Sequence, residues 1–160
     1  MDEAKVTCKF FCEGQITNRK NLFKESLIHA EVGKVLYILK EELNELPQLS
    51  QDMSVVNKHY LKMISFLYVS TLEALIESLI GLPVWQNVPH TIILEDLGEY
   101  CDKNDKHRAC GLIAFLLDAA ISCSKQLRTH CKLYISINVD VVGEDYCNLM
   151  QELYEVSDPQ

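Results

Sequence analysis

A glycine and a lysine at phosphate-loop spacing follow the first apolar segment of the chain. A phosphate loop has a glycine, four residues, a second glycine, a lysine and then Ser or Thr. Gly14 and Lys20 fit this pattern, but Arg19 replaces the second glycine and Asn21 the hydroxyl residue. Arginine disfavours the backbone geometry that directs N–H groups at phosphate, and the lost hydroxyl is a usual magnesium ligand. We therefore expect a strand-to-helix turn without hydrolysis, with residual nucleotide binding through Lys20 as the alternative.

A second candidate site lies where another apolar segment meets two acids. Residues 91–94 are followed by Glu95 and Asp96, which resembles a Walker B strand. The carboxylate of such a strand holds magnesium, usually through water, and either acid fits that role. The alternative is a buried strand that simply runs into a polar loop. Both candidate stretches follow strands, and sites in open α/β sheets form at the carboxyl ends of strands.

The seven cysteines do not predict a metal centre. They have irregular spacing and include no C-x-x-C pair, although His107 and Cys110 are spaced to share a helix face. We interpret them as structural thiols of a reducing compartment. Basic residues form only two small groups, one of Arg19, Lys20 and Lys24, the other of Lys125, Arg128, His130 and Lys132. Solvated surface is the default interpretation of both groups, with a DNA contact as the alternative.

Alternating strands and helices predict the fold class. Strands are expected over residues 6–12, 34–39, 63–68, 90–94 and 131–139, and helices over 18–31, 106–127 and 144–154. A further helix is expected between a Ser70 cap, with Glu73 completing a capping box, and Gly81. Residues 41–54 are expected to be a loop, with at most one helical turn. This order predicts one α/β domain over residues 1–160, with a mainly parallel sheet and helices on both faces.

Composition limits the classes of function. Hydrophobic residues make up 48% of the 160 residues and charged residues 24%, which is typical of a globular domain. The net charge of −8 gives no global attraction to nucleic acid, so any DNA contact must be local or supplied by a partner. The acidic start, Met1 to Glu3, does not predict a secretory signal, and no apolar run is long enough to predict a membrane span.

Several segments resemble one known family. Residues 92–100, 112–120, 124–127 and 133–138 carry the resemblance, and residues 34–39 and 62–68 fit the same order. Together they resemble the ATPase-like subunit that accompanies a SWIM-domain protein in the Shu complex, a family distantly related to RecA-type recombinases. The resemblance covers most of the chain but is specific only in its second half. It implies a truncated RecA-like core, which leaves room for a partner to complete the surface.

The resemblance also implies a role and a set of positions. Lys20 would correspond to the phosphate-loop lysine, Glu95 or Asp96 to the Walker B acid, and Asn138 to a polar sensor. The implied role is DNA repair by homologous recombination, in the nucleus with the cytosol as the alternative. The implied partners are a SWIM-domain zinc protein and the strand-exchange recombinase, with single-stranded DNA contacted through the complex. Arg19 and Asn21 depart from the family pattern, so we expect a degenerate ATPase that requires no cofactor.

Two other classes of function remain open from the sequence. One is a nucleotide hydrolase with an unusual phosphate loop, for which ATP and magnesium would be the cofactors. The other is a thiol- or metal-dependent regulatory α/β domain unrelated to recombination. Magnesium-dependent ATP binding that requires Lys20 would favour the first, and stoichiometric zinc would favour the second.

Overall fold

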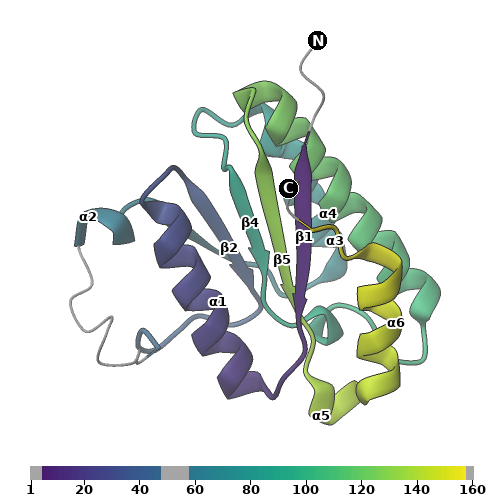
Figure 1. Cartoon of the computed structure of the whole chain (residues 1–160). Coiled ribbons are helices and arrows are strands. Elements are labelled where there is room, and N and C mark those ends of the chain that lie inside the picture. The colour runs from purple at the N-terminus through teal and green to yellow at the C-terminus, as the bar shows by residue number, and fades with distance from the viewer. Residues whose placement is uncertain (1–4, 48–57, 158–160) are drawn as a thin grey trace.

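Five parallel strands form the centre of the computed structural model, which describes residues 5–47 and 58–157 (Figure 1). The strands are β1 (Val6–Phe11), β2 (Val35–Leu39), β3 (Ile64–Tyr68), β4 (Thr91–Leu94) and β5 (Cys131–Ser136). They lie in the order β1-β5-β4-β2-β3, and each neighbouring pair is parallel. Every residue of β2 and β4 is buried, as expected of strands covered on both faces. The predicted parallel sheet is therefore confirmed.

Helices cover both faces of the sheet, as predicted (Figure 1). On one face, α1 (Gln15–Ala30) buries Leu22 and Phe23 against Tyr37 of β2, and α2 (Lys58–Leu61) lies beside α1. On the other face, α3 (Leu72–Gly81), α4 (Lys106–Leu127) and α6 (Glu144–Tyr154) share one apolar core with the strands. The short elements are α5 (Val139–Val142) and the 3-10 turns η2 (Leu82–Val84) and η3 (Leu97–Glu99).

The longest helix, α4, has the bounds that its sequence predicts. Asp105 caps its start by accepting a hydrogen bond from the Arg108 N–H at 3.0 Å, and Arg128 ends it in the left-handed region at φ 55°. By length and composition alone, α4 could also cross a membrane. In this fold, however, Leu112, Ile113 and other residues of its buried face pack into the core beneath the sheet.

Three local predictions from the sequence are wrong. The first helix begins at Gln15, three residues earlier than the expected start at residue 18. Thr71, not Ser70, caps α3, because the Thr71 hydroxyl accepts a hydrogen bond from the Ala74 N–H at 3.1 Å. The last strand ends at Ser136, because Asn138 caps a short helix at a position where the apolar pattern predicts continued strand. Residues 41–47 of the expected loop contain no helix or strand, and residues 48–54 lie outside the described residues.

Leu116→Ala and Phe115→Ala test whether α4 is a core helix. Leu116 is 0% exposed and Phe115 is 41% exposed on the same helix. We expect Leu116→Ala to lower the free energy of unfolding by about 2–5 kcal/mol because it leaves a cavity. Phe115→Ala should cost about 1 kcal/mol or less. Urea unfolding followed by circular dichroism measures both, and equal costs would contradict the placement of α4.

Candidate functional site

The connection between β1 and α1 is too short to form a phosphate loop. Only Cys12, Glu13 and Gly14 separate the strand from the helix, and Gly14 is the N-cap residue with φ −70°. The Asn18 N–H already donates to the Gly14 carbonyl at 2.9 Å, as in a first helical turn. Lys20 therefore lies in the second turn of α1, where its side chain is exposed. The residues from Gln15 to Lys20 form a helix and do not wrap around a ligand-sized space.

Asn18 fixes this short connection to the end of the neighbouring strand. Its side-chain oxygen accepts from the Glu13 N–H at 2.9 Å. Its side-chain NH2 donates to the carbonyls of Glu13 at 2.9 Å and Ile137 at 3.0 Å. Asn18 is 2% exposed, so these bonds satisfy a polar group that burial would otherwise penalise. The sequence analysis missed Asn18, although it lies four residues before the buried Leu22 and so on the same helix face.

Gly14 and Asn138 belong to one junction at this edge. A Cβ atom on residue 14 would come within 2.9 Å of the Asp140 carboxylate, so the close approach of α5 is what favours glycine there. Asn138 caps α5, since its side-chain oxygen accepts from the Asp140 N–H at 3.1 Å. Asn138 thus makes a local helix cap, which is a structural role for the residue predicted as a sensor.

Glu95, the predicted Walker B acid, is paired with a residue of the first helix. Arg19 Nε donates to Glu95 Oε1 at 2.9 Å, and Arg19 Nη2 donates to Oε2 at 2.7 Å. The Tyr37 hydroxyl donates to Oε1 at 2.8 Å. Two parallel N–H···O bonds of this kind are the strongest geometry that an arginine and a carboxylate can adopt. The arginine that replaces the second glycine of the phosphate-loop pattern therefore neutralises the acid of the other candidate stretch.

The two side chains of the pair are buried to different extents. Glu95 is 6% exposed, whereas the Arg19 side chain is 34% exposed. The pKa of the Arg19 guanidinium is raised, mainly because the guanidinium donates hydrogen bonds to Glu95. Burial, reinforced by the charge of Glu95, raises the pKa of the Tyr37 hydroxyl, which keeps it protonated and able to donate. Both oxygens of the carboxylate are consequently engaged by protein donors.

Asp96, the other candidate acid, adopts a left-handed backbone conformation with φ 65°. Its N–H donates to the Ser136 hydroxyl at 2.8 Å, and its carboxylate accepts from the Gly98 N–H at 3.1 Å. Burial, with the charges of Glu99 and Glu95, raises the pKa of the Asp96 carboxyl from 3.8 to about 6. Asp96 therefore combines a strained backbone conformation with a carboxyl group whose charged form is disfavoured by burial.

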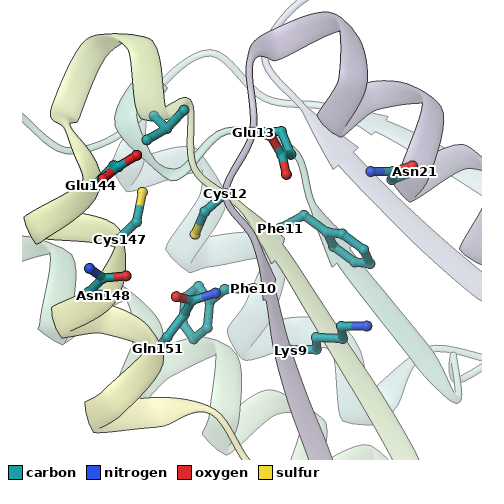
Figure 2. Close-up of a pocket in the computed structure, with 11 residues that line it drawn as sticks. Lys9, Phe10, Phe11, Cys12, Glu13, Asn21, Glu144, Cys147, Asn148 and Gln151 are labelled. Carbon is teal, nitrogen blue, oxygen red and sulfur yellow. The ribbon is translucent and has the colours of Figure 1, made fainter.

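The predicted site residues are thus divided among four places. Glu95 and Asp96 lie together at the end of β4, and Gly14 and Asn138 lie near α5. Lys20 is on the exposed face of α1. Asn21 lines a separate pocket of about 470 Å³ between β1 and α6 (Figure 2). The Tyr37 hydroxyl contacts Glu95, and the Ser136 hydroxyl contacts the N–H of Asp96. The sequence does not predict these two contacts, because they depend on which strands are neighbours.

Most of the cysteines are buried in the fold. All seven are free, and only Cys12 and Cys110 are half-buried rather than buried. Burial raises the pKa of the thiols of Cys101 and Cys123 to about 11 and that of Cys131 to about 12, which disfavours the reactive thiolate. Among residues 5–47 and 58–157, no group of three or more His, Cys, Asp or Glu side chains is arranged to hold a metal ion.

Comparison with known proteins assigns no family to this arrangement. No protein-family model matches the chain, and no curated protein matches its sequence.

Removing Arg19 tests the energetic role of the ion pair. Arg19→Ala leaves a buried carboxylate without its cation, so the free energy of unfolding should fall by about 2–3 kcal/mol. The neighbouring, exposed Lys20→Ala should change it by about 0.5 kcal/mol or less. Adding Glu95→Gln to Arg19→Ala should recover part of the loss, because the unpaired charge is gone. Urea unfolding measures these costs. If the losses of Arg19→Ala and Glu95→Gln simply add in the double variant, the pairing is contradicted.

Asp96→Asn tests the raised pKa. A folded-state pKa above the unfolded value means that Asp96 makes the fold less stable as the pH rises from about 4 to about 6. Asparagine tolerates the left-handed backbone and can still accept from Gly98. Allowing for partial solvent screening, we expect a gain of about 1–2 kcal/mol at pH 7 that shrinks toward zero below about pH 4.

Asp102→Asn is the matched control for this pH series. Asp102 is exposed and its carboxylate accepts from the Asn104 N–H at 2.8 Å, so its substitution preserves a similar contact without the burial. Urea unfolding at several pH values gives both curves. A gain for Asp96→Asn that does not depend on pH would show that the backbone conformation, not the charge, limits stability here.

Proposed function

We propose that this chain is a non-catalytic subunit of a homologous-recombination mediator complex, in which it acts through protein contacts. The resemblance of residues 92–100, 112–120 and 133–138 to the Shu-complex ATPase-like subunit is the source of the proposal. In that role it would bind a SWIM-domain zinc protein and support the strand-exchange recombinase on single-stranded DNA in the nucleus. A RecA-like origin of the fold is part of the same proposal.

The bidentate Arg19–Glu95 pair is the observation that supports a non-catalytic role. Catalysis of phosphoryl transfer requires a carboxylate that is free to position magnesium and a backbone loop that surrounds the phosphates. Here Arg19 and Tyr37 engage the carboxylate, and the helix begins directly after Gly14. Glu95, the acid that a nucleotide site would use to position magnesium, instead pairs with Arg19 and holds α1 to the sheet.

The arrangement of strands is compatible with the proposed ancestry. The strand that carries Glu95, β4, is separated from β1 by β5, whose end carries Ser136 and then Asn138. The strands point the same way, so Glu95 and Asn138 reach the same edge of the sheet, whereas Lys20 lies on the exposed face of α1. This supports descent from a nucleotide-binding fold whose site has become structural.

Co-purification tests the proposed partners. The tagged chain, expressed in cells and recovered from nuclear extract, should bring the SWIM-domain zinc protein, and that complex should bring the recombinase. Mass spectrometry identifies both, with an unrelated tagged protein as control. Mixing the purified chain with purified SWIM-domain protein should then form a complex of defined size. Failure to form it, with the chain folded and soluble, would refute the proposal.

The nucleotide arm of the same experiment uses Lys20→Ala. Because Lys20 is exposed and away from the ion pair, its substitution should leave both the fold and the recovery of partners unchanged. A ligand that binds only the folded state raises the Tm. We expect the wild-type chain not to bind ATP, so magnesium and ATP should leave its Tm unchanged. A Tm increase that is lost in Lys20→Ala would favour the alternative of a nucleotide-binding protein.

A further inference from the structure

Two thiols from distant parts of the chain lie side by side at the wall of the pocket between β1 and α6 (Figure 2). Cys12 belongs to the connection that follows β1, and Cys147 belongs to α6. A hydrogen bond joins the two side chains, with the Cys12 S–H donating to the Cys147 sulfur. A disulfide forms only between thiols that the fold already brings together, and these two meet that condition.

The pocket gives small molecules access to this pair. Its volume is about 470 Å³, and polar side chains of α6 line it beside the thiols. Cys12 is half-buried, and Cys147 is 2% exposed but lines the pocket. Cys123 and Cys131, by contrast, are buried in the core and do not line this pocket. An oxidant small enough to enter the pocket can therefore reach Cys12 and Cys147 together.

The surroundings determine which thiol of the pair loses its proton first. Burial raises the pKa of the Cys147 thiol, and the hydrogen bond from Cys12 opposes part of that rise. Burial, followed by the hydrogen bond to Cys147, raises the pKa of the Cys12 thiol. The hydrogen bond thus favours Cys147 as the first nucleophile, because the thiolate is the form that attacks an oxidant. Since both pKa values are raised, oxidation should be slow near neutral pH and faster as the pH rises.

We propose that Cys12 and Cys147 form a reversible disulfide when the chain meets a peroxide. The Cys147 thiolate attacks one oxygen of hydrogen peroxide, which breaks the O–O bond, forms a sulfenic acid and releases hydroxide. The Cys12 thiolate then attacks the Cys147 sulfur and displaces a second hydroxide. The two thiol protons convert both hydroxides to water. Two electrons pass from the thiol pair to the peroxide, so two thiols and one hydrogen peroxide give one disulfide and two waters.

The disulfide would fix α6 to the sheet at a second point. Val156, which follows α6, already exchanges two backbone hydrogen bonds with Cys8 of β1, at 3.0 and 2.9 Å. Cys147 lies in the first half of α6, so a bond to Cys12 holds the other end of the helix. Oxidation therefore holds the pocket between β1 and α6 in one shape. This redox response goes beyond the proposed function and does not depend on it.

Peroxide treatment of the reduced full chain tests the pairing. After oxidation and blocking of free thiols, peptide mapping by mass spectrometry should show Cys12 linked to Cys147, and dithiothreitol should restore both thiols. A link from Cys147 to Cys110, or one between Cys123 and Cys131, would overturn the assignment. So would a folded chain whose thiols stay reduced under conditions that oxidise the urea-unfolded chain.

Serine substitutions test the structural consequence. A disulfide that closes a loop of about 135 residues constrains the unfolded chain, so oxidation should raise the urea midpoint of the wild-type chain by about 1–2 M. Cys12→Ser and Cys147→Ser should each abolish this rise. Cys110→Ser is the matched control, because Cys110 is also half-buried but lies on α4. The curves of the reduced variants show whether each folds, and a rise that persists in Cys12→Ser would contradict the proposal.

Trapping of the sulfenic acid tests the order of the steps. In Cys12→Ser, the serine can still donate a hydrogen bond to Cys147, so dimedone should trap a sulfenic acid at Cys147. The rate of trapping should rise about tenfold for each unit of pH between about 7 and 9, because the thiolate fraction rises in that proportion below the pKa. Equal or faster trapping at Cys12 in Cys147→Ser would overturn the assignment of Cys147 as the first nucleophile.

Discussion

The buried carboxylate of Glu95 is the constraint on which this edge of the fold depends. An acid that is 6% exposed must be paired, because an isolated buried charge costs several kcal/mol or more. Arg19 supplies the charge from α1 and Tyr37 supplies a hydroxyl from β2, so three elements are fixed by one side chain. The pair stabilises α1 over the sheet in a single orientation. It also explains why the position resembling a catalytic acid offers no free oxygen for catalysis.

The tight connection before α1 completes this arrangement. With only three residues between β1 and the helix, the first turn of α1 lies against the ends of β1 and β5. Asn18 binds both strands there through Glu13 and Ile137, and Gly14 leaves room for Asp140. A longer, glycine-rich loop would move α1 away from Glu95. The short connection and the ion pair therefore act together to hold α1 against the sheet.

The sequence predicts the sheet well and the contacts of the site poorly, for a physical reason. Unbroken apolar segments such as Val35–Leu39 and the long stripe of α4 are local patterns, and they identify elements without knowledge of neighbours. The partner of Glu95 depends on which strand lies beside which, and this order is not local. Arg19 was therefore interpreted as a defect in a loop, although it is the residue that the acid requires. The start of α1 was misplaced because Gly14 and Asn18 act through contacts with the distant residues Asp140 and Ile137.

The two edges reached by β1 differ in how fully their polar groups are paired. At the carboxyl edge, Arg19 and Tyr37 engage both oxygens of Glu95, so this carboxylate has little left to offer a ligand. At the outer edge, the same strand carries backbone groups at Phe10 that no described residue pairs with as Val156 pairs with Cys8. Backbone pairing needs no catalytic residue and tolerates much sequence change, because the bonding groups belong to every residue.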